Sequence, residues 1–311
     1  MIAQTSKAFF HALARSRTLK RLASRYGMRH PGSFARRFIV GEDVDEALGA
    51  ARAIQASGLM LTLDLLGEAV ANMAEADAAT RAYLNLMDRI VAAGIERNIS
   101  LKLTQLGLTI DRATSVDNLR RILDAATKHD FFVRVDMEDS PFTQITLEIF
   151  ETMWQQGYRN AGIVLQSYLR RSVADARRMN ELGARVRLVK GAYTEPKEVA
   201  YQSKADVDAA FVEISKLLLA EGHYPAIATH DPAMLGAAHA FASERRIAPD
   251  RYEFQMLYGI RRDLQARLLA GGYRMRVYVP FGREWFPYFM RRLGERPANI
   301  GFVIRGLLRE H

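Results

Sequence analysis

Short apolar runs of five to seven residues alternate along the chain with longer segments in which apolar residues recur at helical spacing. The runs lie at residues 59–65, 100–104, 131–136, 161–166, 186–190, 226–230, 252–256 and 275–279. Amphipathic segments separate them at 69–93, 116–128, 144–156, 173–182, 198–221, 233–244 and 261–270, and another, 44–56, precedes the first run. Strands alternating with helices are typical of a parallel α/β sheet.

Eight such units over about 240 residues predict a closed (β/α)₈ TIM-type barrel, a fold of roughly 250 residues. The alternative is a doubly wound open sheet, which normally has a glycine-rich turn after its first strand. Here residues 65–68 read Leu-Leu-Gly-Glu, and the chain has no Walker A sequence. We therefore expect a catalytic barrel over 59–311, preceded by a basic helical arm over 1–58.

A last helix is expected at 287–296, after the eighth strand, where it would lie over the barrel mouth. It begins on Pro287 and carries the pair Arg291 and Arg292, with Glu295 one turn further on. Glu295 can neutralise one guanidinium. The other then suits a carboxylate ligand, because its planar fork of donors matches two carboxylate oxygens. The alternative is a solvated basic helix face.

Charge is concentrated at the N-terminus, and the net charge of +9 comes entirely from there. Residues 1–41 hold nine Lys or Arg and no acid, which leaves 35 basic and 35 acidic residues in the rest. An apolar stripe accompanies these cations, as in a helix that binds an anionic membrane surface or an acidic partner. A transit peptide, a nucleic-acid arm and a helix packed on the barrel remain alternatives.

Polar residues stand at or near the C-terminal ends of the runs, and in a barrel these ends meet at one mouth. They are Asp64, Lys102, Asp136, Gln166, Lys190, Thr229, His230, Gln255 and Tyr278. Each has a structural alternative, such as a helix N-cap for Asp64. Absence of cysteine, HExxH and GxSxG sequences argues against thiolate, zinc and serine chemistry. A basic, amide-rich mouth suits an anionic cofactor and a carboxylate substrate, and Gly191 would let the backbone approach a ligand closely.

Seven segments together resemble the proline dehydrogenase family in its short monofunctional bacterial form. They are LKLTQLG (101–107), VRVDMEDS (133–140), GIVLQSYLRRS (162–172), RVRLVKGAY (185–193), IATHDP (227–232), YEFQMLYGIR (252–261) and YVPFGREWFPYFMRRLGERPAN (278–299). The resemblance runs from about residue 59 to the C-terminus. It implies a distorted (β/α)₈ barrel with non-covalently bound FAD.

The resemblance also implies roles for individual residues. Asp136 and Arg187 would be catalytic, with Arg187 near the reactive side of the flavin. The substrate-binding residues would be Lys102, Leu257, Tyr278, Arg291, Arg292 and Glu295. The cofactor-binding residues would be Met137, Gln166, Arg187, Lys190, Gly191, Ala192, Tyr193, Thr229, His230 and Gln255. No metal is expected.

The implied activity is oxidation of L-proline to Δ1-pyrroline-5-carboxylate by hydride transfer to flavin N5, with a membrane quinone as electron acceptor. The expected location is cytoplasmic, on the inner face of a bacterial membrane, held there by the basic arm. A pyrroline-5-carboxylate dehydrogenase is an expected partner and nucleic acid is not. Two other classes stay open: a flavin barrel that uses a nicotinamide donor, such as a folate reductase, and a non-catalytic scaffold or nucleic-acid binder.

Overall fold

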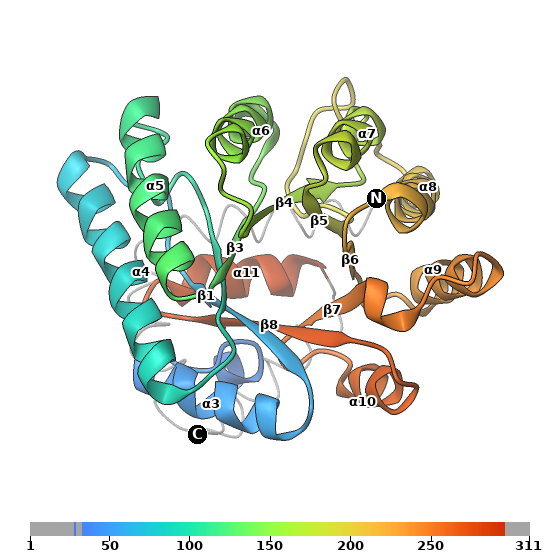
Figure 1. The fold of residues 1–311 in the computed structure, drawn as a ribbon, viewed down its shortest axis with the longest axis horizontal. Helices are drawn as coiled ribbons and strands as arrows, with labels where there is room; N and C mark the ends of the chain where they lie inside the picture. The colour runs from blue at the N-terminus through green and yellow to red at the C-terminus, as the bar shows by residue number, and fades with distance from the viewer. Residues whose placement is uncertain (1–27, 29–32, 296–311) are drawn as a thin grey trace.

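The computed structural model describes Met28 and residues 33–295, without the side chains of Phe34 and of residues 293–295. Its centre is a closed barrel of parallel strands in sequence order, with β8 paired to β1 (Figure 1). The strands are β1 (Met60–Leu65), β2 (Asn98–Leu101), β3 (Phe132–Val135), β4 (Ala161–Gln166), β5 (Arg185–Val189), β6 (Ala226–Ala228), β7 (Glu253–Leu257) and β8 (Met275–Phe281). The predicted (β/α)₈ barrel is thereby confirmed.

Helices surround the barrel where the amphipathic segments predicted them (Figure 1). They are α3 (Val44–Ala56), α4 (Met73–Ala93), α5 (Arg112–Lys128), α6 (Ser140–Gln155), α7 (Ser172–Leu182), α8 (Lys204–Glu221), α9 (Pro232–Glu244), α10 (Arg262–Ala270) and α11 (Trp285–Glu295), with short 3₁₀ turns η1 (Phe34–Arg37) and η2 (Pro249–Arg251). Several begin at a side chain that accepts a backbone N–H, as Asn72 does for α4 and Asp111 for α5. No helix in the described residues is both long and apolar enough to cross a membrane.

The hydrophobic core lies between the strands and the helices, while the inside of the barrel is polar. On β1, Leu61 and Leu63 are fully buried in that core. Thr62, one position along, points inward to the hydroxyl of Ser100 on β2, with 3.2 Å between the oxygens. Since strand side chains alternate, the same period of two puts charged and amide side chains of most strands inside the barrel. The interior is therefore built for polar contacts from its floor to its mouth.

Two helices depart from the regular barrel plan. Helix α3 contacts β1 and β8 and buries Ala47, Leu48 and Ala51 in the barrel core, although it belongs to the predicted arm. It thus occupies the outer position that would follow β8. Helix α11 instead crosses one end of the ring of strands (Figure 1). It starts at Trp285, so the predicted start at Pro287 was wrong by two residues.

The segment before α3 packs against α11. Phe38 and Ile39 share an apolar cluster with Trp285 and Phe289 of α11. A backbone bond also ties this segment to the end of β8, since Val40 donates its N–H to the carbonyl of Pro280 at 3.1 Å. The described end of the predicted arm is therefore part of the folded body. Most of the arm, residues 1–27 and 29–32, lies outside the described residues.

Candidate active site

The mouth of the barrel is centred on an ion pair between Arg187 of β5 and Asp136, the residue after β3. Arg187 Nη1 donates to Asp136 Oδ1 at 2.7 Å, and its Nη2 donates to Ser100 Oγ at 3.0 Å. The second oxygen of Asp136 accepts the hydroxyl of Tyr278 from β8 at 2.9 Å. The Arg187 guanidinium also lies 5.2 Å from the centre of the Tyr278 ring. Residues far apart in sequence thus meet, as expected from strand ends of a barrel.

A second charged pair joins Asp64 of β1 to Lys102, which follows β2. Lys102 Nζ lies 3.5 Å from Asp64 Oδ1, and Asp64 is fully buried. Burial raises the pKa of Asp64, Lys102 opposes this rise, and Asp136 adds to it. Desolvation lowers the pKa of Lys102, but Asp64 and Asp136 outweigh it, so the Lys102 pKa lies above its usual value. Lys102 is therefore a permanent cation in the mouth.

Helix α11 brings its arginines to this end of the barrel. Arg291 Nη1 lies 3.5 Å from Oε1 of Glu68, which stands in the β1–α4 loop and is half exposed. Arg292 lies over the ring of Tyr288, one turn earlier, at 5.2 Å from its centre. The side chain of Glu295, predicted as the partner of the arginine pair, lies outside the described residues.

Residues of the opposite wall come from β4, β6 and β7. Gln166 and Gln255 are buried inward-facing amides at the end of β4 and within β7. His230 follows β6, and its Nε2 accepts the N–H of Leu257 at 2.9 Å. That bond holds the ring as a neutral imidazole with its proton on Nδ1. Thr229 Oγ1 accepts the N–H of Asp231 at 3.1 Å, and Met137 is buried after β3.

Lys190 does not point a free charge at the mouth. Its Nζ lies 2.5 Å from Asp208 Oδ1 and 2.9 Å from Asp231 Oδ2, where α9 begins. Two carboxylates neutralise this lysine. Its predicted contact with the cofactor would therefore bring no net positive charge. Asp231 is also the N-cap of α9, where its side chain accepts the N–H of Ala233.

The segment after Lys190 is held by side chains beneath it. Gly191 has φ +108°, and a Cβ there would stand 2.3 Å from the ring of Tyr168. A side chain at position 191 would therefore collide with Tyr168, while the close approach of a ligand predicted there stays a prediction. Ala192 and Tyr193 follow, both partly exposed. Burial raises the pKa of Tyr193 to about 12, and Arg291 opposes that rise, which places Tyr193 near the arginine of α11.

The interior carries buried polar atoms that fit a polar ligand. Among the described residues, Gln166 Oε1, Gln255 Oε1 and Arg187 Nε have no hydrogen-bond partner. Leaving such atoms buried and unpaired costs about 1–3 kcal/mol each. Two acceptors, on β4 and β7, and one donor, on β5, match a flat heterocycle with both donors and acceptors, such as an isoalloxazine ring. These residues therefore fit a flavin, and the described residues hold no His, Asp and Glu cluster suited to a metal.

Three residues of the mouth are not identifiable as site residues from the apolar runs alone. Glu68 lies in the turn after the first run, Ser100 starts the second run, and Tyr288 lies within the last helix. Tyr288 could have been identified from the sequence, because it stands one helical turn before the arginine pair. Only the fold reveals the other two.

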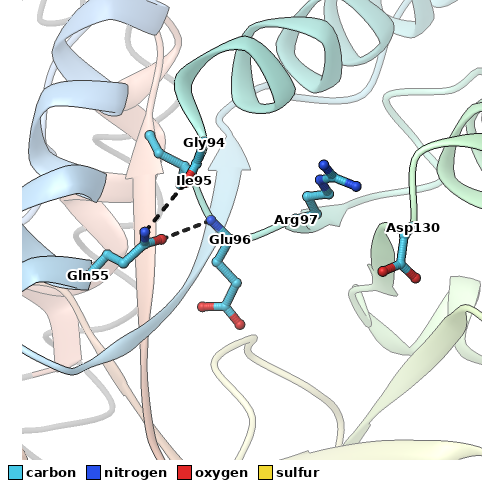
Figure 2. Close-up of a pocket in the computed structure, with 6 residues that line it drawn as sticks. All are labelled: Gln55, Gly94, Ile95, Glu96, Arg97 and Asp130. Carbon is cyan, nitrogen blue, oxygen red and sulfur yellow. Dashed lines mark hydrogen bonds between the residues drawn. The ribbon is translucent and has the colours of Figure 1, made fainter.

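A separate cavity lies at the other end of the barrel. It measures about 440 Å³ and is lined by Gln55, Asp130 and residues 94–97 (Figure 2). Figure 2 shows Gln55 bonded to the backbone of this stretch, where α4 ends and β2 begins. Because active sites of these barrels sit at the C-terminal strand ends, this cavity is not the active site.

Comparison with known proteins agrees with the mouth chemistry. The family model described as "Proline dehydrogenase" matches residues 47–305. Proline dehydrogenase 1 of Bacillus subtilis is 40% identical over 301 residues, which cover 97% of this chain and 98% of that protein. Proline dehydrogenase of Deinococcus radiodurans is 41% identical, covering 89% of this chain and 91% of that protein.

A solved structure supports the same relationship. The crystal structure of proline utilization A from Bdellovibrio bacteriovorus, inactivated by N-propargylglycine, superposes with a TM-score of 0.80 at 30% identity. The match covers 84% of this chain but only 32% of that one. The similarity of length to the Bacillus and Deinococcus enzymes fits the monofunctional type. The chain belongs to the proline dehydrogenase family.

Proposed function

We propose that this proline dehydrogenase oxidises L-proline to Δ1-pyrroline-5-carboxylate with non-covalently bound FAD. When bound, FAD supplies the two-electron oxidation, taking a hydride at N5 from the ring carbon beside the proline nitrogen. The observation that carries the proposal is the set of buried, unpaired polar atoms on Gln166, Gln255 and Arg187 inside the barrel. Family membership supports the same reaction class.

The substrate carboxylate would be bound by the cations of the mouth. Arg291 and Arg292 present planar forks that suit a bidentate contact with a carboxylate. Lys102 adds a compact charge from the neighbouring strand end. Glu295 would hold the two arginines in place, a role we retain as a proposal, while Glu68 is the carboxylate that lies against Arg291.

Arg187, Asp136 and Tyr278 would form the reacting wall. Arg187 places a positive charge where negative charge develops as electrons arrive. Asp136 balances that charge, and both its oxygens already accept hydrogen bonds. This favours charge balance over uptake of the amine proton as the role of Asp136. Tyr278 and Leu257 would contact the proline ring and limit substrate size.

The remaining proposed cofactor contacts lie on the far side of the mouth. Gln166 and Gln255 would bind the flavin ring through their amides. Met137, Lys190, Gly191, Ala192, Tyr193, Thr229 and His230 would complete the cradle. Of these, His230 accepts the N–H of Leu257 at Nε2, which fixes the orientation of its ring.

We further propose that electrons pass to a membrane quinone and that residues 1–27 bind an anionic membrane surface. Six of the chain's cations lie in that stretch and no acids, and each basic residue near such a surface adds about 1 kcal/mol of attraction. The enzyme would work at the inner face of the bacterial membrane, and a pyrroline-5-carboxylate dehydrogenase would use its product.

A visible spectrum tests the proposal. The purified protein should be yellow, and anaerobic L-proline should bleach it while NADH should not. Bleaching by NADH alone would favour a nicotinamide-dependent flavin barrel. A colourless protein whose DNA binding falls steeply with salt would favour a nucleic-acid binder.

A further inference from the structure

Asp64 stands out among the buried carboxylates of the mouth. It is 0% exposed, and no well-aligned hydrogen bond from a described residue reaches its oxygens, although Tyr278 and Lys102 lie close enough to lower its pKa. Its one charged contact is Lys102 Nζ at 3.5 Å. The neighbouring Asp136, in contrast, accepts bonds from both Arg187 and Tyr278. A desolvated carboxylate without well-aligned hydrogen bonds is costly to bury, and perturbed groups of this kind cluster at functional sites.

The groups that face Asp64 come from four elements. Lys102 follows β2, Asp136 follows β3, Tyr278 belongs to β8, and Tyr83 reaches in from α4. Lys102 is the only cation among them, and it also lies close enough to feel the charge of Arg291. Asp64 is closed to solvent, and its ion-pair partner among the described residues is Lys102. Its charge can therefore act on a substrate carboxylate through that lysine.

We propose that Asp64 is a positioning residue, which holds Lys102 Nζ against the substrate carboxylate, and that its protonation at acid pH weakens substrate binding. The inference rests on the proposed function and assigns a residue to its carboxylate subsite. Lys102 carries its charge on a flexible four-carbon stem, so a fixed anion beside the ammonium removes conformations that point elsewhere.

The sign of the pH effect follows from the environment of Asp64. Burial raises its pKa, so the charge is present at alkaline pH and is lost as pH falls through this raised value. Lys102 keeps its own proton throughout, because its pKa lies above the usual range. Acid pH thus leaves Lys102 charged but released from Asp64.

The experiment measures binding of tetrahydrofuran-2-carboxylate to the full-chain holoenzyme by calorimetry at about pH 8 and about pH 5. This compound has the ring and carboxylate of proline but no amine to titrate. Wild type should bind it more weakly at the lower pH. Asp64→Asn should weaken binding about tenfold at the higher pH, as expected for loss of a charged contact, and should abolish the pH dependence.

Glu138→Gln is the matched control. Glu138 is also a buried carboxylate of the mouth, but it accepts bonds from Thr104, at 3.2 Å from the backbone N and 2.6 Å from Oγ1, and forms no ion pair with Lys102. Its variant should keep the wild-type pH dependence. Lys102→Met should abolish that dependence by itself, which keeps the test open if Asp64→Asn fails to fold.

A double-mutant cycle separates positioning from general damage. In a Lys102→Met background, Asp64→Asn should change the dissociation constant less than twofold. Additive losses, or an Asp64→Asn variant with wild-type affinity at both pH values, would overturn the inference. If wild type itself is neither yellow nor bleached by proline, the proposed function fails, and that outcome is distinct from the other two.

Discussion

At the scale of single residues, Asp64 and Asp136 show that two identical side chains can have different roles because their surroundings differ. Both occupy inward-facing positions at nearby strand ends, and the sequence pattern gives them equal weight. Asp136 accepts hydrogen bonds on both oxygens, whereas Asp64 accepts no well-aligned hydrogen bond and has only the longer approach of Lys102 and Tyr278. The difference arises from side chains distant along the chain, since Tyr278 is 142 positions from Asp136. No local pattern predicts it.

Arg292 carries the first prediction at this scale. Replacing it by alanine should raise KM for proline by at least about thirtyfold, because a buried charge-assisted contact to the carboxylate is worth about 2–4 kcal/mol. The turnover number should change less, since the carboxylate is bound in the ground state and the transition state alike. Steady-state kinetics over a range of proline concentrations measure both.

Arg283→Ala is the control for Arg292, because Arg283 is an exposed arginine just before α11. It should leave KM within about twofold of wild type, as surface substitutions usually do. Unchanged proline kinetics in Arg292→Ala would remove this arginine from the substrate site.

Residue types at strand ends are predictable from the sequence, but their partners are not. The order of the apolar runs predicts Lys102, Asp136 and Tyr278 at one mouth, because parallel strands in a barrel end on the same side. The neutralisation of Lys190 by Asp208 and Asp231 has no such signal. Those carboxylates lie on a different helix and turn, and their approach depends on tertiary packing.

At the scale of elements, the pattern predicted the strands to within about two residues except β2, which was expected at 100–104 and lies at Asn98–Leu101, and it predicted the helix ends less well. Alternation fixes a strand because one face meets the helices and the other the barrel interior. Helix α11 begins earlier than expected, since Pro287 stands at its third position, where a missing N–H leaves no helical bond unmade. A proline therefore predicts the first residue of a helix to within about one turn.

The segment between β5 and α8 gives an element-scale prediction. Glu195 in this segment accepts the N–H of Ser140 at 2.7 Å and also its hydroxyl, at the start of α6. Glu195→Gln should loosen the segment that carries Tyr193, because a carboxylate bridging two chain segments becomes a weaker amide. A loss of about 1 kcal/mol is expected, as for a helix cap.

Hydrogen exchange measures this loosening directly. Amides of residues 191–203 and of Ser140 should exchange faster in Glu195→Gln, while Glu198→Gln, an exposed acid in the same segment, should match wild type. Equal exchange in the two variants would show that Glu195 does not secure the segment.

At the scale of the whole molecule, the barrel is closed at its floor by a buried ion-pair network. Arg276 of β8 bonds both oxygens of Glu253 on β7, at 2.8 and 3.0 Å, and reaches Glu96 before β2 at 2.6 Å. Desolvation raises the pKa of Glu253, but Arg276 outweighs it and brings the pKa to about 2. The network links β7 and β8 to the segment before β2 and leaves the mouth free for chemistry.

Glu253→Gln should destabilise the fold by about 3 kcal/mol near neutral pH, since breaking this buried pair leaves Arg276 with the more exposed Glu96 as its remaining carboxylate. The folded-state pKa of Glu253 is depressed, so its contribution is present above the unfolded value near 4.5 and is lost as pH falls toward 2. The gap between variant and wild type should therefore shrink across that window.

Urea unfolding at several pH values measures the gap. Glu213→Gln, an exposed acid on α8, should show no gap at any pH. A Glu253→Gln gap that stays constant down to about pH 2 would contradict the linkage.

The contacts of Phe38 and Ile39 determine which truncation can test the proposed membrane role of the basic arm. Removing residues 1–40 would strip Phe38 and Ile39 from the cluster they form with Trp285 and Phe289, so any loss of membrane binding could reflect damage to α11. Removing residues 1–27 takes away six cations and spares that cluster. At about 1 kcal/mol per cation near an anionic surface, the loss is large enough to abolish flotation.

Full-length protein should float with vesicles containing phosphatidylserine, less so at high salt, and not with neutral vesicles. The shortened chain should not float with these vesicles, but proline should still bleach it. Equal flotation of both proteins would place the membrane contact on the barrel instead.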